Sequence, residues 1–133
     1  MKYLVAYIVT AVVFLGLDAL WLSRIALDLY RRELGSLLLH KPNLVIAGLF
    51  YLIFVVGIVV LAIAPALNGG TWINALLMGA VLGLVAYGTY DITNLSTLKN
   101  WSLTVTLADL AWGTALTAIS ATIGYWVVSA LNL

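Results

Sequence analysis

The sequence contains no cysteine and only one histidine, and 8% of its 133 residues are charged. Without cysteine the chain has no disulfide, no thiolate metal ligand and no cysteine nucleophile. The single histidine, His40, excludes a bis-histidine haem site within one chain and also a histidine-rich metal site. We therefore expect no metal and no cofactor. The net charge of +1 provides no strongly basic face, so a nucleic-acid partner is not expected either.

Apolar residues dominate the composition of the chain. They make up 65% of the chain, and the mean hydropathy is +1.15. A soluble domain carries about 25% charged residues, and a chain this small leaves much of its surface exposed. The excess of apolar residues therefore indicates a protein whose surroundings are lipid.

Four apolar runs organise the chain. The expected spans are about residues 3–25, 44–64, 71–91 and 103–128. Each is near the roughly 20 residues that a helix needs to cross the hydrocarbon layer, and strands would leave backbone groups unpaired in lipid. The first run contains Asp18 and is longer than the apolar part of a signal peptide, so we interpret it as a retained span. The sequence predicts an all-α, integral membrane bundle of four transmembrane helices, with residues 1–133 forming one domain.

Basic residues predict the orientation of these spans. Four spans place both termini and the 65–70 turn on one side, and the 23–43 and 94–102 loops on the other. The loop side carries most of the basic residues, and the terminal side carries only Lys2. The residues on the loop side are Arg24, Arg31, Arg32, Lys41 and Lys99. The positive-inside rule then predicts cytoplasmic first and third loops and periplasmic termini. Leu37–Leu39, next to His40 and Lys41, are expected to lie on the inner headgroups, with His40 interfacial rather than catalytic.

Three aspartates are unusual because they lie within the apolar runs. They are Asp18, Asp91 and Asp109. Placing a carboxylate in mid-membrane costs about 2.5–3.5 kcal/mol on insertion scales. Each of the three aspartates therefore needs either a stabilising partner or a functional role. Counted from the expected ends of the spans, Asp18 and Asp109 lie roughly 9–12 Å inside the same membrane face, and Asp91 closes the third span there. We expect the three to share one level in the cytoplasmic half.

Helical spacing predicts which faces these acids occupy. The stretches "DALW" at 18–21 and "DLAW" at 109–112 each place a tryptophan one turn from an aspartate. Trp21 and Trp112 can shield the carboxyl groups from lipid and donate an indole N–H. On the third span, small residues at four-residue spacing lead to a polar end, and such a row allows close approach of a neighbouring helix. This row runs Ala75, Gly79, Gly83, Tyr87 and Asp91, with Asn94 three residues further on.

Two interpretations of the acids stay open. Carboxyl groups that meet in a medium of low dielectric cannot all ionise at low cost, which favours a proton-linked or cation-binding site. Alternatively, Asp18 and Asp109 hold helices together by accepting hydrogen bonds, and Asp91 is an interfacial or capping residue. The stretch 87–101, "YGTYDITNLSTLKNW", is either a polar pocket for a headgroup or small ligand, or a loop with helix caps such as Ser102 or Asn100.

Residues 87–114, "YGTYDITNLSTLKNWSLTVTLADLAWGT", together with "GLDALWL" at 16–22, carry a family resemblance. The chain resembles an uncharacterised bacterial family of four-helix inner-membrane proteins, a domain of unknown function. The resemblance implies a bacterial inner-membrane location and brings no established activity.

The sequence therefore predicts a small inner-membrane protein, surrounded by the bilayer, whose activity three hypotheses describe. The first is a proton- or ion-linked transport or ligand-binding unit, as a homo-oligomer, centred on a polar site. The residues of that site are Asp18, Trp21, Tyr87, Asp91, Asn94, Asp109 and Trp112. The second is an accessory or assembly subunit of a larger membrane complex. The third, a lipid-modifying enzyme with Asp91 or Asp109 as general base, ranks last because the chain lacks a recognisable nucleophile or metal cluster.

Overall fold

The computed structural model describes residues 1–39 and 43–133, so His40 and Lys41, expected at the membrane interface, lie outside the described residues. Every regular element in the described part is helical. In chain order the elements are α1 (Lys2–Trp21), a π-helical turn (Leu22–Ala26), α2 (Leu27–Leu34), a 3₁₀ turn (Gly35–Leu37), α3 (Leu44–Ile58), a π-helical turn (Val59–Ile63), α4 (Ala64–Leu67), α5 (Trp72–Thr97) and α6 (Leu103–Ala130).

Four continuous helical segments are long and apolar enough to cross a membrane. They are Lys2–Leu37, Leu44–Leu67, Trp72–Thr97 and Leu103–Ala130. Most of their large apolar side chains point outwards, as expected where lipid replaces water as the surrounding medium. The predicted all-α bundle of four membrane-spanning helices is confirmed.

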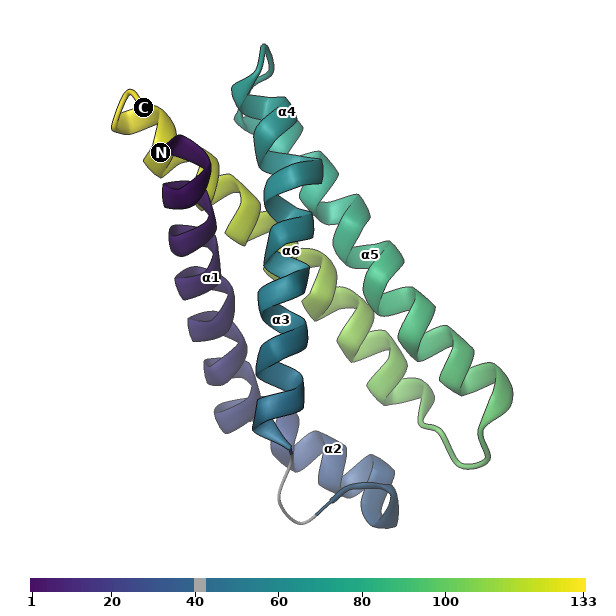
Figure 1. Ribbon diagram of the computed structural model, residues 1–133. Helices are drawn as coiled ribbons and strands as arrows, with labels where there is room; N and C mark the ends of the chain where they lie inside the picture. The colour runs from purple at the N-terminus through teal and green to yellow at the C-terminus, as the bar shows by residue number, and fades with distance from the viewer. Residues whose placement is uncertain (40–42) are drawn as a thin grey trace.

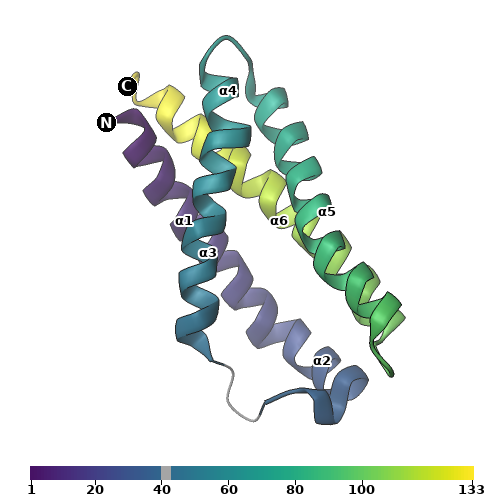
Figure 2. The ribbon, with the colours of Figure 1, turned by 45° about the vertical axis from the view of Figure 1, so that its right-hand side comes forward.

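The bundle is closed at one end and splayed at the other (Figure 1). Both termini and the turn between α4 and α5 lie at the closed end, whereas α2 and the 98–102 connection lie at the splayed end. In both views α3 and α5 meet beside that turn and diverge away from it (Figure 2). The segment α2 turns away from the axis of α1 after the π-helical turn, an interruption that commonly bends a helix.

The tight contact between α5 and α6 depends on the small-residue row predicted on the third span. A methyl group added at Gly79 would lie 3.0 Å from the Cα atom of Ala118, and one at Gly83 would lie 2.9 Å from the side chain of Thr117. A methyl group at Gly83 would also overlap the carbonyl oxygen of Gly113. The row therefore brings two backbones of the same chain together.

The third span ends later than the sequence predicts. It was expected to close near residue 91, but α5 continues to Thr97. The polar residues after Asp91 suggested a loop. In the structure, however, hydroxyl groups among them donate hydrogen bonds to backbone carbonyl groups of the same helix. Ser96 donates to the carbonyl of Ile92 at 2.7 Å, and Thr97 donates to that of Thr93 at 2.8 Å. Asp91 is therefore an internal helix residue, and its expected role as a helix-end cap is wrong.

The helix α6 begins at one of the two cap residues that the sequence suggested. The side chain of Ser102 caps it by accepting a hydrogen bond from the backbone N–H of Val105 at 3.1 Å. Thr71 and Asn74 form a capping box at the start of α5. These caps fix where the two most tightly packed helices begin.

Candidate functional site

Three buried aspartates from three different helices lie toward the splayed end of the bundle. Asp18 on α1 is 6% exposed, Asp109 on α6 is 8% exposed, and Asp91 on α5 is fully buried. The only ion pair among residues 1–39 and 43–133 joins Arg32 to Glu33 at 4.0 Å, on the surface. Within that part of the chain, no basic side chain neutralises any of the three acids.

Trp112 holds Asp18 in place. Its indole Nε1 donates to Asp18 Oδ1 at 3.1 Å, a contact between α6 and α1. The ring of Trp112 stacks on that of Trp21, with centroids 4.8 Å apart and planes 9° apart. Tyr51 on α3 lines the same cavity as Asp18. The two "D-x-x-W" turns thus interlock, since the tryptophan of one contacts both the aspartate and the tryptophan of the other.

Tyr30 reaches Asp109 from α2. Its hydroxyl group donates to Asp109 Oδ1, and one turn further on Glu33 Oε2 accepts a hydrogen bond from Ser102 Oγ at 3.0 Å. These two contacts join α2 to α6 across the splayed end. The segment between the first two spans, which was expected to be helical no further than about Tyr30, is helical as far as Leu37 and contributes to the site.

Asp91 is the least satisfied of the three acids. Neither of its oxygens meets a hydrogen-bond donor, and its nearest ionisable neighbour is the carboxyl group of Asp109. Two carboxylates are both acceptors, so a hydrogen bond between them requires that one of them carries a proton. The Asp91–Asp109 pair can therefore hold one proton between two helices.

A cavity of about 700 Å³ lies at this end of the bundle. All four spans and α2 contribute to its wall. Its lining residues are Asp18, Trp21, Leu22, Tyr30, Ala47, Phe50, Tyr51, Phe54, Ala86, Tyr87, Thr89, Tyr90, Asp109 and Trp112. Eight of these fourteen are aromatic, compared with 11% of the whole chain. This size and a mostly apolar lining with a few polar groups are typical of small-molecule sites.

The most exposed rings of the cavity lining lie on α3 and α5. Phe50 on α3 is 60% exposed and Tyr90 on α5 is 57% exposed, whereas Asp18 and Asp109 are buried. The exposed rings therefore mark the mouth, and the carboxyl groups mark the inner wall. Both rings belong to helical segments that are long and apolar enough to cross a membrane.

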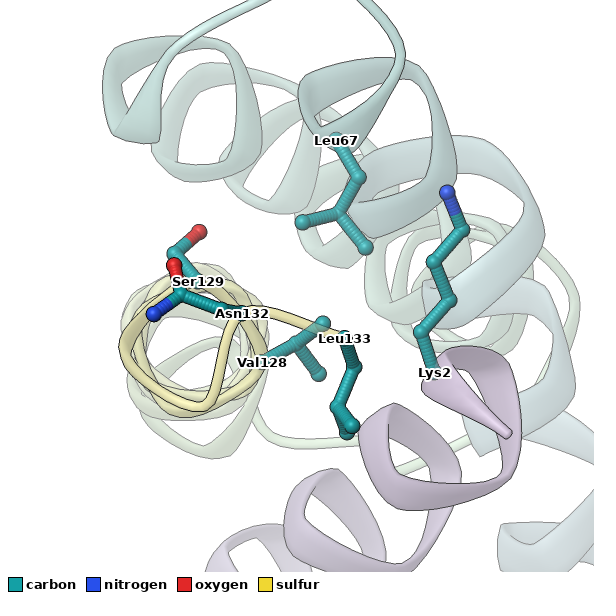
Figure 3. A pocket seen from close by; sticks show the side chains of 6 residues that line it. All are labelled: Lys2, Leu67, Val128, Ser129, Asn132 and Leu133. Carbon is teal, nitrogen blue, oxygen red and sulfur yellow. The ribbon is translucent and has the colours of Figure 1, made fainter.

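A second cavity, of about 380 Å³, lies at the closed end of the bundle and is unrelated to the acids (Figure 3). It is lined by Lys2, Leu67, Val128, Ser129, Asn132 and Leu133. Between the two cavities α6 carries Thr117 and Ser120, whose hydroxyl groups are buried and have no hydrogen-bond partner. The hydroxyl group of Thr10 on α1 is in the same situation, so polar groups continue inside the bundle beyond the level of the acids.

A family match covers nearly the whole chain. Residues 3–126 match the family described as "Predicted membrane protein (DUF2177)". The chain belongs to this family. The family is one of membrane proteins of unknown function, as the sequence resemblance implies. No curated protein and no solved structure matches the chain.

The structure of this family member brings most of the predicted site residues together. Asp18, Trp21, Tyr87, Asp109 and Trp112 all line the large cavity. Asp91 stands behind Asp109, outside the lining, and the half-buried Asn94 lies one turn further along α5, next to Tyr90. Of the stretch 87–101, for which a pocket was one of two interpretations, only Tyr87, Thr89 and Tyr90 line the cavity.

Sequence reasoning missed four rings of the cavity lining, which are Tyr30, Phe50, Tyr51 and Phe54. The signal for Tyr30 was present, because it continues the face of Asp18 and Leu22 at helical spacing through Ala26. Tyr51 and Phe54 lie on an apolar helix with no polar landmark, and they pack against Phe14 with ring centroids 5.6 Å and 5.5 Å away. Nothing in their local sequence separated cavity-lining rings from core rings.

Proposed function

We propose that this protein is a small ligand-binding and transport unit of the membrane, in which ligand binding is linked to a proton. The observation that supports the proposal best is the aromatic cavity that ends on Asp18 and Asp109. Those carboxyl groups come from different helices and have no basic partner in the described part of the chain. Buried ionisable groups inside a membrane bundle commonly mark substrate or proton paths.

The alternative, that the acids only hold helices together, accounts for part of the site. It explains Asp18, which accepts from Trp112, and one oxygen of Asp109, which accepts from Tyr30. It does not explain Asp91, which is fully buried without a donor to either oxygen. A residue that is costly to bury and whose oxygens accept no hydrogen bond from a neutral donor is better explained by a role in function.

The Asp91–Asp109 pair supports the link to a proton. Asp109 lines the cavity and Asp91 stands behind it, so a proton shared by the two carboxyl groups lies next to any bound ligand. When a ligand interacts with the Asp109 carboxylate, the proton passes to Asp91 or leaves the site. The buried hydroxyl groups of Thr117, Ser120 and Thr10 supply polar groups further along the bundle.

The accessory-subunit alternative loses one of the two features that favoured it, and keeps the absence of soluble domains. The glycine row on α5 offered a seam for a partner protein, but α6 of the same chain occupies that seam. The proposal therefore retains the bilayer as the surrounding medium. Association with a second copy stays a prediction from the small size of the bundle.

We also propose a location in the bacterial inner membrane, with the splayed end in the cytoplasm. Arg24, Arg31 and Arg32 belong to the π-helical turn and α2 at that end, and Lys99 belongs to the 98–102 connection. Lys2 lies at the other end. An alkaline phosphatase fusion at Leu133 should be active and a green fluorescent protein fusion there dark. The reverse result contradicts this orientation.

A proton-gradient assay tests the proposed function. Proteoliposomes with an internal pH dye and an imposed gradient are exposed in turn to cationic, anionic and neutral amphiphilic compounds. We expect one class to discharge the gradient faster with the wild type than with Asp109→Asn. Asp28→Asn, which removes an exposed acid on α2, should behave as the wild type. If no class changes the proton flux of the folded protein, the proposed function is wrong.

A further inference from the structure

The chemistry of the cavity wall indicates which class of ligand it fits, on the premise of the proposed function. We infer that the cavity binds a hydrophobic organic cation, an amine or onium compound whose positive charge lies against Asp18 and Asp109. The following observations on charge, wall chemistry and access support this class.

The charge of the lining excludes an anionic ligand. It contains two carboxyl groups and, among the described residues, no lysine, arginine or histidine. An anion would lie against Asp18 and Asp109 with no compensating charge, in surroundings where Coulomb interactions are stronger than in water. A cation meets the opposite situation, because it neutralises carboxylates that otherwise lack a basic partner.

The size and the aromatic wall distinguish an organic cation from an inorganic ion. A metal ion needs a close shell of several oxygen or nitrogen ligands, and the described residues contain no group of three His, Asp or Glu side chains that could hold one. A bare ion would also leave most of the roughly 700 Å³ empty. Faces of tryptophan, tyrosine and phenylalanine attract organic cations through the ring quadrupole.

Three rings are placed to provide those faces. Phe50 and Tyr90 stand at the mouth, on α3 and α5, and Tyr87 lies on the wall one turn before Asp91. The ring of Tyr87 fits where Gly113 has no side chain, since a methyl group at Gly113 would overlap it. Gly113 thus keeps the ring of Tyr87 close to α6 and leaves room in the cavity.

A mouth between Phe50 on α3 and Tyr90 on α5 fits a ligand that arrives from the membrane. An organic cation with a large apolar part partitions into the bilayer surface and can enter between α3 and α5. It passes Phe50 and Tyr90 before it reaches the carboxyl groups. Protons and the cation compete for the same carboxyl groups, so lower pH weakens binding and binding of the cation displaces a proton.

Binding of a matched pair of probes tests this inference. Tetraphenylphosphonium and tetraphenylborate have the same shape and opposite charge. Equilibrium binding to the full chain in mild detergent, corrected with protein-free micelles, should be saturable for the phosphonium alone. Asp18→Asn and Asp109→Asn should each weaken it by at least about tenfold, the cost of removing one partner of a buried charge pair. Asp28→Asn should leave it unchanged.

A mouth variant keeps the test valid if the aspartate variants fold poorly. Phe50→Leu changes an exposed residue, retains apolar character and removes one aromatic face. It should weaken phosphonium binding by roughly two- to fivefold, the range for a partly exposed cation–π contact. Trp126→Leu, about equally exposed near the closed end, should have no effect.

The outcomes separate the two proposals. If the borate binds as tightly as the phosphonium with the same dependence on Phe50, the cavity is a ligand site but not a cation site. In that case the inference is wrong and the proposed function stands. If the phosphonium shows no saturable binding to folded protein, the inference is also wrong. The proton-gradient assay with anionic and neutral compounds then decides the proposed function independently.

Discussion

Replacing Asp91 by asparagine tests whether this buried acid serves function or stability. Asp91 is fully buried, and neither of its oxygens meets a donor. An ionised aspartate inside a membrane costs about 2.5–3.5 kcal/mol on insertion scales. Asparagine has nearly the same shape and no charge, and its amide can donate to the Asp109 carboxylate without a shared proton. Hydrogen bonds to charged groups contribute about 1.5–3 kcal/mol.

We therefore expect Asp91→Asn to leave the free energy of unfolding unchanged, where the pair already shares a proton, or to raise it by up to about 3 kcal/mol, where both acids are ionised. The same substitution is expected to slow ligand-linked proton flux, because the Asp91–Asp109 pair no longer shares a proton. The free energy of unfolding is measured by titration with a denaturing detergent, followed by circular dichroism. Asp28→Asn, on the exposed face of α2, is the matched control and should change it by less than about 0.5 kcal/mol. A loss of about 1 kcal/mol or more in Asp91→Asn refutes the reasoning, since it means that the acid stabilises the bundle.

The remaining predictions concern the seam and the interlocked tryptophans. Gly83→Ala should lower the free energy of unfolding by about 1–3 kcal/mol, because its methyl group meets Thr117 at 2.9 Å in the α5–α6 seam. Gly16→Ala, where nothing lies within 4 Å, should be neutral or stabilising by up to about 1 kcal/mol, and equal effects in the same titration would contradict the seam. Trp112→Phe removes the donor to Asp18 and should cost about 1.5–3 kcal/mol. Trp126→Phe, which is half exposed, should cost clearly less, and a larger loss there would argue against the α1–α6 contact.

The general architecture and the level of the acids follow from simple patterns in the sequence. Four apolar runs predict the bundle, and the row Ala75, Gly79, Gly83 predicts a close helix contact. The two "D-x-x-W" turns predict polar faces, because helical spacing fixes which residues share a face. What the pattern cannot supply is the partner of each face. That Trp112 donates to Asp18 depends on how α1 and α6 cross.

Two features of the splayed end were hidden for different reasons. The polar stretch after Asp91 indicated a loop, but the hydroxyl groups of Ser96 and Thr97 bond to the carbonyl groups one turn earlier and allow the helix to continue. The charged residues after Tyr30 also indicated the end of the first helix, although the helix continues through α2, which carries Tyr30 to Asp109. In both cases the polar residues mark where the apolar part of the span ends, and the helix itself continues beyond that point.

Cross-linking of a double-cysteine variant tests most directly whether the acids of separate helices meet at one level. The chain has no cysteine of its own, so Trp21→Cys combined with Trp112→Cys gives one defined pair at the ring contact of α1 and α6. The account predicts rapid intramolecular cross-linking by a short bifunctional thiol reagent in native membranes. It also predicts no cross-link for Trp21→Cys combined with Trp126→Cys, which lies near the other end of α6. Failure of the first pair to react, or equal reaction of both pairs, would contradict the account.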